Sequence, residues 1–357
     1  MSKKLRFIDL FAGIGGIRIP FQKLGGECVF TSEFDKFAQK TYERNFRETP
    51  AGDITQINSK DVPAHDLLLG GFPCQAFSGA GYKKGFNDTR GTLFFDIQRI
   101  LAHHQPAMFL LENVKQLRSN NSGKTFETII NILTGENFQR FPQSLKLNPE
   151  SKKSLNVRLN YSVGYKVISA NDHGVCQKRE RVYIIGFNKK YFKDIIFRDP
   201  EDKQNDLFNN NKLEFLWPRK VPLKKTLKDI LFANKDVDPK YTLSDKLWAG
   251  HQIRKKRNME KGNGFSYGLF NHNDSYTNTI SARYYKDGSE ILICQKDIKK
   301  NPRKLTPREC ARIQGYPESF KIDAVSDVQL YKQFGNSVSV PVIRKLAKAM
   351  INVYEQI

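Results

Sequence analysis

Short apolar runs alternate with helical patterns from the start of the chain to residue 188. Gly16–Leu24 and Asp35–Phe46 have helical patterns, and each follows an apolar run. The runs that we expect to form buried strands are Leu5–Leu10, Cys28–Glu33, Asp66–Gly70, Met108–Leu111 and Arg181–Phe187. Because strands that alternate with helices build βαβ units, the pattern predicts a doubly wound α/β sheet.

The pattern changes after residue 188. Apolar runs become fewer, Asn, Gly and Tyr become frequent, and Arg254–Arg257 is a basic run. Helical periodicity returns at Thr306–Gln314, which Gly315 ends, and again at Pro341–Tyr354. We therefore expect four parts: a large domain over residues 1–188, a smaller loop-rich domain over 189–304, a hinge and support segment over 305–335, and a C-terminal helix over 336–357 that returns to the large domain.

The chain carries a large excess of positive charge. Its 357 residues include 59 Lys and Arg against 37 Asp and Glu, a formal net charge of +22. An excess of this size attracts polyanions and predicts salt-dependent binding to phosphate backbones. Charge alone leaves a second interpretation open, a Lys-rich solvated surface without a nucleic-acid partner.

Cysteine spacing and hydropathy argue against several classes of protein. The five cysteines are odd in number and form no Cys-x-x-Cys pair, which argues against a disulfide framework and against a zinc site. No run of about 18 apolar residues occurs, and Met1–Lys4 leads into the first apolar run without a signal-peptide cleavage site. We expect a cytoplasmic protein without a membrane span or a metal ion.

A glycine-rich turn, Phe11–Gly16, follows the first predicted strand. Glycines there let a ligand approach the backbone at the start of a helix. A dinucleotide fingerprint would place a further glycine at position 18, where this chain has Arg18, so a pyrophosphate cradle is disfavoured.

Two carboxylates suit an adenosine ligand near this turn. Glu33 ends the second predicted strand, where it can accept both hydrogens of a ribose diol, although a surface cap is the alternative. Asp53 follows a Gly turn at the expected end of a third strand and can accept a hydrogen bond from an adenine amino group. An adenosine without pyrophosphate suggests S-adenosylmethionine.

Cys74 lies in the Gly- and Pro-rich segment Gly71–Ser78, directly after an apolar run. A free cysteine is most often a small buried residue. Pro73 and Gln75 beside it favour a turn instead, where the thiol can act as a nucleophile.

Glu112 follows the apolar run that begins at Met108. It is expected at the same edge of the sheet as Cys74, as a general acid or as a helix cap. Arg179 and Arg181 stand at alternate positions before another strand, so both can point to this edge unless they are solvated.

Six motifs in a common order resemble the bacterial C5-cytosine DNA methyltransferases of restriction–modification systems. They are Phe11–Gly16, Pro73–Gln75, Glu112–Val114, Gln177–Arg181, Leu305–Glu309 and Gln333–Val338. Arg90–Phe95 and Ala311–Pro317 are similar to the family as well, and the resemblance covers nearly the whole chain outside residues 190–300. Each motif alone is a weak signal, and their common order indicates the family.

The resemblance implies a Rossmann-like, mixed-sheet fold of the S-adenosylmethionine-dependent methyltransferases, with catalysis in residues 1–188 and target recognition in residues 189–304. A cytosine would be turned out of the duplex, and Cys74 would add to its C6 atom. Glu112 would protonate or hydrogen-bond N3, while Arg179 and Arg181 would bind O2 and hold Glu112. The methyl group of S-adenosylmethionine would pass to C5.

The resemblance also implies the residues that contact the ligands. The methyl donor would contact Phe11, Gly13, Ile14, Glu33, Phe34, Asp53, Ile54, Pro73, Leu93 and Asn336. DNA would contact Gln75, Ser78, Arg90, Arg283, Tyr284 and Lys286. Phe34 stands where relatives often have Trp, and Ala80 stands where a serine occurs in a catalytic loop.

The expected partners are double-stranded DNA and a cognate restriction endonuclease, and the enzyme is expected to be a monomer. Thr279–Glu290 resembles segments that read short GC-rich palindromes, although an ordinary surface hairpin is the alternative. Two other functions stay open from the sequence. One is an RNA cytosine methyltransferase, and the other is a silent DNA-binding regulator, which would be expected to have lost Cys74 or Glu112.

Overall fold

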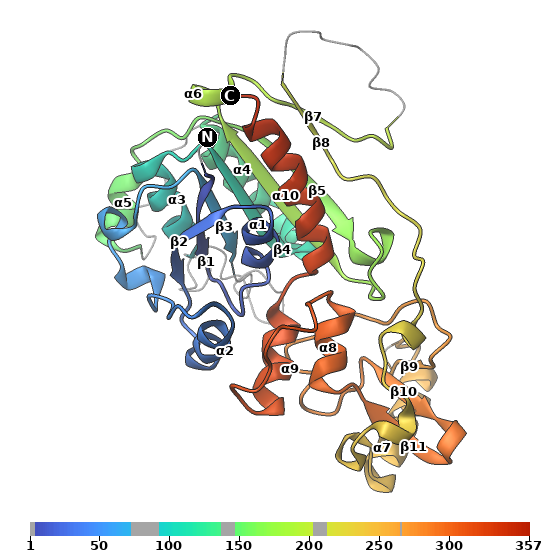
Figure 1. The fold of residues 1–357 in the computed structure, drawn as a ribbon. Helices are drawn as coiled ribbons and strands as arrows, with labels where there is room; N and C mark the ends of the chain where they lie inside the picture. The colour runs from blue at the N-terminus through green and yellow to red at the C-terminus, as the bar shows by residue number, and fades with distance from the viewer. Residues whose placement is uncertain (1–3, 73–92, 137–146, 203–212, 265) are drawn as a thin grey trace.

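The computed structural model describes residues 4–72, 93–136, 147–202, 213–264 and 266–357. Six strands of these residues form the central sheet (Figure 1). They are β1 (Arg6–Leu10), β2 (Glu27–Ser32), β3 (Leu67–Gly71), β4 (Met108–Val114), β5 (Tyr161–Ser169) and β6 (Glu180–Asn188). Their spatial order is β2-β1-β3-β4-β6-β5. Strands β1 to β4 run parallel and β6 is antiparallel to β4 and β5, so the expected mixed α/β sheet is confirmed.

Two strand predictions differ from the structure. β5, which forms one edge of the sheet, was not predicted, because its partly exposed residues lack a continuous apolar run. The third strand expected before Asp53 is absent among residues 47–53, where the chain turns at Gly52 (φ +86°) and then enters a 3-10 helix, η1 (Ile54–Gln56). The strand that pairs with β1 on this side is β3 instead.

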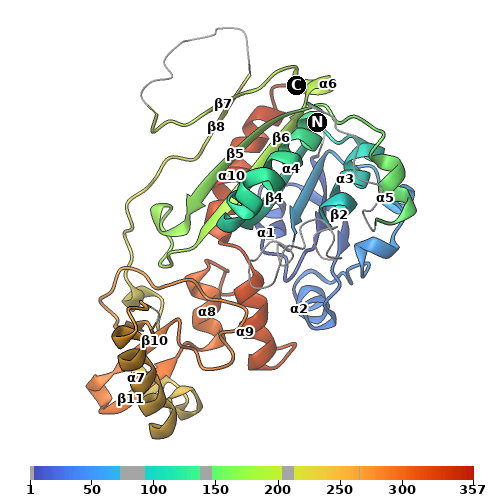
Figure 2. The same ribbon diagram turned by 180° about the vertical axis from the view of Figure 1, so that it is seen from behind.

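Helices cover both faces of the sheet (Figures 1 and 2). Alternate residues of β3 point to opposite faces, so Leu67 and Leu69 enter one core and Leu68 enters the other. The first core is closed by α1 (Arg18–Lys23) and α10 (Val340–Tyr354), and the second by α3 (Leu93–His104) and α4 (Lys124–Thr134). The other helices of this domain are α2 (Lys36–Phe46), α5 (Pro149–Ser154) and α6 (Lys189–Phe192).

Polar caps fix the ends of helices near the predicted site. Asp35 accepts the backbone N–H groups of Phe37 and Ala38 through Oδ1, at 2.8 and 3.0 Å, and so begins α2. Thr306 and Glu309 form a reciprocal capping box at the start of α8 (Pro307–Ile313). Helix α9 (Asp327–Asn336) follows and leads into α10.

The second domain lies below the sheet in Figure 1. It contains a three-stranded sheet in the order β11-β10-β9 and the helix α7 (Asp245–Glu260). The strands are β9 (Leu269–Phe270), β10 (Leu292–Gln295) and β11 (Lys300–Lys304). Ile14 of the large domain shares a core with Ile280, Tyr284 and Phe334, so apolar packing links the two domains.

We expected the second domain to begin at residue 189, but the first strands after this residue pack against the large domain. β7 (Ile196–Arg198) and β8 (Glu214–Leu216) pair with each other, and Phe215 and Trp217 pack in the same core as β6 and α10. These apolar residues therefore belong with the large domain. Among the described helices, none is both long and apolar enough to span a membrane.

Candidate active site

The parallel strands β3 and β4 end at the same edge of the sheet, where Glu112 lies. In the register of β3 and β4, Gly71 pairs with Glu112. A Cβ atom on Gly71 would lie 3.7 Å from Glu112 Oε2, and Asn113 donates from Nδ2 to the carbonyl oxygen of Phe72 at 3.0 Å. The chain is thus held beside Glu112 up to Phe72. Cys74, Pro73, Gln75, Ser78 and Arg90 lie outside the described residues.

Glu112 is a buried carboxyl next to a guanidinium. Arg181 Nε lies 3.1 Å from Glu112 Oε1, and the two side chains are 14% and 10% exposed. Burial raises the pKa of Glu112, and the charges of Arg181 and Arg179 oppose this rise. The site therefore favours a carboxyl that can hold a proton where an exposed glutamate would have lost it.

Arg179 lies behind this pair and has backbone partners. Its Nη1 donates to the carbonyl oxygen of Ile280 at 3.2 Å, and its Nη2 donates to those of Gly335, at 3.2 Å, and Ser337. Burial lowers the pKa of Arg179 to about 9. Its terminal nitrogens thus join the second domain and α9 to the large domain, while Nε has no hydrogen-bond partner in the described part of the chain, and the binding of the base by Arg179 stays a prediction.

The glycine-rich turn after β1 has the geometry of a ligand site. Gly13 has φ +55°, and a Cβ atom there would meet no other atom within 4 Å. The N–H of Gly13 donates to Glu33 Oε2 at 2.7 Å, and the N–H of Asp35 donates to Glu33 Oε1 at 2.7 Å. Burial raises the pKa of Glu33. Phe34 beside it is 76% exposed, which leaves an aromatic face free for a ligand.

The other predicted cofactor residues within the described ranges lie on several elements. Asp53 accepts the N–H of Thr55 through Oδ1 at 3.0 Å and caps η1. Ile14 and Ile54 are buried, so their side chains pack in the cores. Asn336 is exposed at the end of α9, and its neighbour Ser337 comes close to the turn, because a Cβ atom on Gly16 would lie 3.0 Å from Ser337 Oγ. Phe11 lies in the turn, and Leu93 begins α3.

The predicted DNA contacts of the second domain divide into two groups. Arg283 and Lys286 are exposed in a turn in which the N–H of Lys286 donates to the carbonyl oxygen of Arg283 at 2.9 Å. The prediction for Tyr284 is wrong, because this side chain is fully buried. Its hydroxyl donates to the carbonyl oxygen of Ile291 at 2.6 Å and accepts the N–H of Leu305 at 2.8 Å.

Two buried ionisable residues outside the predicted set were missed. Asp9 in β1 is fully buried, and neither of its carboxyl oxygens has a hydrogen-bond partner in the described part of the chain. Burial raises its pKa to about 8. A charged residue within the apolar run Leu5–Leu10 was the available signal. Arg99 on α3 is the second missed residue, and it is 1% exposed.

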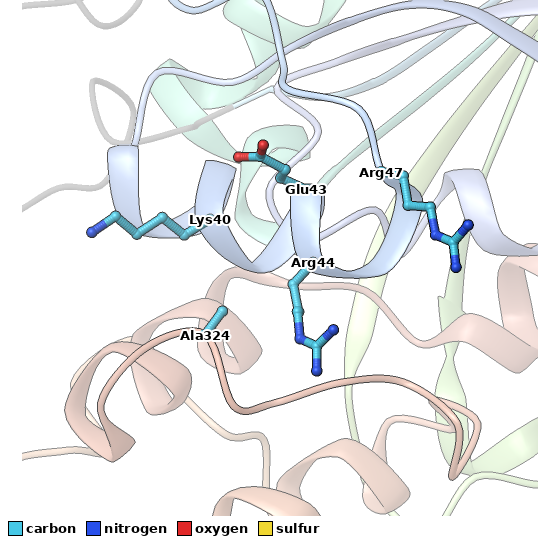
Figure 3. A pocket seen from close by; sticks show the side chains of 5 residues that line it. All are labelled: Lys40, Glu43, Arg44, Arg47 and Ala324. Carbon is cyan, nitrogen blue, oxygen red and sulfur yellow. The ribbon is translucent and has the colours of Figure 1, made fainter.

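A shallow hollow on the outer side of α2 lies apart from this site (Figure 3). It is lined by Lys40, Glu43, Arg44, Arg47 and Ala324. Arg44 is paired with Asp323, with Nη2 and Oδ2 2.8 Å apart. None of the predicted catalytic or cofactor residues lines this hollow. Within the described ranges, no cluster of His, Cys, Asp and Glu could hold a metal ion.

Comparisons with known proteins show the family of the chain. Residues 5–352 match the family model described as C-5 cytosine-specific DNA methylase. The chain is 51% identical to the type II methyltransferase M.DsaV of Dactylococcopsis salina, over 98% of this chain and 87% of that protein. It is 52% identical to M.SsoII of Shigella sonnei (99% and 81%) and 38% identical to M.HhaI of Haemophilus parahaemolyticus (96% and 93%).

Solved structures share the fold at lower identity. The Entamoeba histolytica methyltransferase EhMeth aligns with a TM-score of 0.69 and 20% identity, over 98% of this chain and 99% of that chain. The Dnmt2 methyltransferase of S. pombe aligns with a TM-score of 0.69 and 19% identity, over the same shares.

Proposed function

The chain belongs to the C-5 cytosine-specific DNA methylase family, and from this premise we propose how its residues carry out the reaction. It is a DNA (cytosine-5-)-methyltransferase of the type II restriction–modification class. The observation that carries the residue assignment is the buried Glu112–Arg181 pair beside the end of β3, where the chain continues toward Cys74.

Cys74 is the nucleophile of this proposal. Cytosine C5 is a poor nucleophile, so the thiolate first adds to C6 and forms the C6–S bond, while the electrons of the C5–C6 double bond move toward C5. Cys74 is two residues beyond Phe72, and two residues of chain span at most about 7 Å. This short length supports a thiol that acts close to Glu112, because the carbonyl oxygen of Phe72 accepts a hydrogen bond from Asn113, the residue after Glu112.

Glu112 holds a proton at N3 of the base. Its carboxyl must stay protonated or share a proton at neutral pH, and its raised pKa supports this role. Arg181 fixes the carboxyl through the 3.1 Å ion pair and has further donors for the base O2. Arg179 donates to the surrounding backbone carbonyls and so positions the site, and it is proposed to bind the base O2 together with Arg181.

The residues of the glycine-rich turn fit S-adenosylmethionine. Gly13 is open to a ligand, Phe34 offers an exposed aromatic face for adenine, and Glu33 and Asp53 offer carboxylates to the ribose and to the adenine amino group. Asn336, Leu93 and Ile54 complete the proposed pocket with Phe11, Ile14 and Pro73. When bound, S-adenosylmethionine supplies the methyl group that C5 accepts. Loss of the C5 proton and breakage of the C6–S bond then restore the ring and free Cys74.

The second domain is proposed to select the DNA site. A cytosine inside a duplex is out of reach, so it must leave the stack at a cost of a few kcal/mol. Phosphate contacts offset this cost, and the net charge of +22 and the exposed Arg283 and Lys286 support them. Gln75, Ser78 and Arg90 are proposed to contact DNA from the side of Cys74.

The proposed setting is the bacterial cytoplasm, where the enzyme acts as a monomer and without a metal ion. It protects the DNA of its host from a cognate endonuclease that cuts the same sequence. A short GC-rich palindrome remains the proposed type of site.

Expression in a host without cytosine methylation, followed by bisulfite sequencing, tests the proposal. The wild-type chain is expected to mark one cytosine in a single short sequence throughout the DNA. Cys74→Ser is expected to mark none, whereas the matched control Cys294→Ser keeps the pattern. Methylation by Cys74→Ser would overturn the role of Cys74, and a mark found in RNA alone would overturn the DNA substrate.

A further inference from the structure

Arg99 is a buried cation outside every motif described above. Its guanidinium has partners from four segments of the chain. Nε donates to Asp96 Oδ1 at 2.9 Å, Nη1 to Ser59 Oγ and Glu150 Oε2 at 3.0 Å each, and Nη2 to the carbonyl oxygen of Ile54 at 2.5 Å. One side chain on α3 therefore joins η1, the short 3-10 helix η2 (Ser59–Asp61) and α5.

The bond to Ile54 controls one peptide unit in the proposed adenine pocket. The peptide between Ile54 and Thr55 accepts from Arg99 at its carbonyl oxygen. The N–H of the same peptide donates to Asp53 Oδ1 at 3.0 Å. Because a peptide unit is planar, a donor that fixes the carbonyl also fixes the direction of the N–H. The orientation of the Asp53 carboxylate therefore depends on Arg99.

The partners of Arg99 are themselves held by second bonds. Glu150 Oε1 accepts the N–H of Ser59 at 3.0 Å, and Asn148 Nδ2 donates to Asp96 Oδ1 at 3.2 Å. A planar guanidinium between such partners has one orientation. The network thus transmits a fixed geometry from α3 to the peptide that carries Asp53.

We propose that Arg99 is a positioning residue for the methyl donor, which aims the carboxylate of Asp53 at the amino group of adenine through the Ile54–Thr55 peptide. This inference rests on the assignment of Asp53 in the proposed function. Oδ1 of Asp53 is committed to Thr55, so Oδ2 is assigned to the adenine amino group. A structural role alone would change stability and leave the selectivity for that amino group intact.

Calorimetric binding of S-adenosylhomocysteine and S-inosylhomocysteine separates these roles. In the inosyl ligand an oxo group replaces the amino group at C6 of the purine, and N1 carries a hydrogen. The wild-type protein is expected to prefer the adenosyl ligand by roughly 10- to 100-fold, the range of a hydrogen bond to a charged acceptor. Asp53→Ala removes most of this preference. Arg99→Met is expected to lower this preference at least about fivefold, and Arg99→Lys to lower it less, because the ammonium group of Lys can still donate hydrogen bonds.

Arg303→Met is the matched control. Arg303 is fully buried in the second domain and pairs with Glu309, with Nη1 and Oε2 2.8 Å apart. Its loss is expected to reduce stability and to leave the ratio of the two affinities unchanged. Glu150→Gln is the milder second variant if Arg99→Met does not fold, because the Glu150 side chain is 32% exposed.

The outcomes are distinct. The positioning role is overturned if folded Arg99→Met keeps the wild-type ratio of the two ligand affinities. It is also overturned if the separate variants Glu150→Gln and Arg99→Lys both keep that ratio. If Asp53→Ala keeps the wild-type ratio of the two affinities, Asp53 does not bind the adenine amino group, and the proposal is overturned. Absence of binding of either ligand to the wild-type protein would instead contradict the proposed cofactor pocket as a whole.

Discussion

Arg181 and Glu112 meet diagonally across two antiparallel strands. In the register of β4 and β6, Arg181 stands opposite Val114 and Glu112 stands opposite Tyr183. Glu112 and Arg181 therefore share one face of the sheet, and their Oε1 and Nε atoms are 3.1 Å apart. Both side chains are mostly buried, so solvent screens the pair little. The register of β4 and β6 therefore places the carboxyl of Glu112 beside the guanidinium of Arg181.

Arg181→Met is expected to lower the rate of methyl transfer on the order of 100- to 1000-fold, because an oriented donor is lost. Burial already raises the pKa of Glu112, and Arg181 opposes this rise. Activity that needs the protonated carboxyl falls as pH rises through that pKa. Without Arg181 the pKa rises further, so the fall should move to higher pH in single-turnover measurements.

Lys189→Met is the control for this experiment. Lys189 follows the far end of β6 and pairs with Asp194, with Nζ and Oδ1 3.0 Å apart. Its removal should keep both the rate and the pH profile. An unchanged profile in Arg181→Met would contradict the coupling between Arg181 and Glu112.

Asp9→Asn is expected to change how stability depends on pH. The folded pKa of Asp9 is about 8, against an ordinary value of 3.8, so between these values the folded protein holds a proton that the unfolded chain has lost. The Asp9 contribution to stability is therefore present below pH 3.8 and declines as pH rises toward 8. Asn removes this decline.

Urea unfolding of both proteins from pH 4 to pH 8 measures this effect. The difference in unfolding free energy should move in favour of Asp9→Asn by about 1.4 kcal/mol per pH unit within the window. His65, whose pKa is lowered to about 4 by burial, titrates in both proteins and cancels in the difference. A difference that is independent of pH would show that Asp9 is ionised in the folded state.

Arg179→Met is expected to loosen the junction between the domains. The substitution leaves the carbonyl groups of Ile280, Gly335 and Ser337 without their buried donor, and each unsatisfied group costs about 1–3 kcal/mol. Hydrogen exchange should become faster in residues 277–284 and 335–338, whereas Arg181→Met should leave these amides protected. Equal protection in Arg179→Met and the wild-type protein would contradict the assigned role.

β1, β3 and β4 could be predicted from the sequence because they are mostly buried and therefore contain continuous apolar runs. β5 could not, since its polar and apolar residues are mixed and form no continuous apolar run. The motifs also led to Glu112 and Arg181, which the fold brings together across β4 and β6.

The burial of side chains within polar segments could not be predicted from the sequence. Tyr284 stands between the exposed residues Arg283 and Lys286, yet it packs inward. Arg99 has the appearance of a solvated helix residue, and its partners at Ile54, Ser59 and Glu150 come from distant segments. No local sequence pattern predicts these contacts, because they depend on the tertiary packing of α3 against η1 and α5.

Trapping of a covalent complex tests the role of Cys74. A duplex with 5-fluorocytosine at the target base is incubated with the protein and S-adenosylmethionine, and the products are separated after denaturation. Fluorine at C5 cannot leave as a proton does, so the C6–S bond cannot be released. The wild-type protein should give a denaturation-resistant complex that depends on S-adenosylmethionine, and Cys74→Ser should give none, whereas an equal yield from Cys74→Ser would contradict the mechanism.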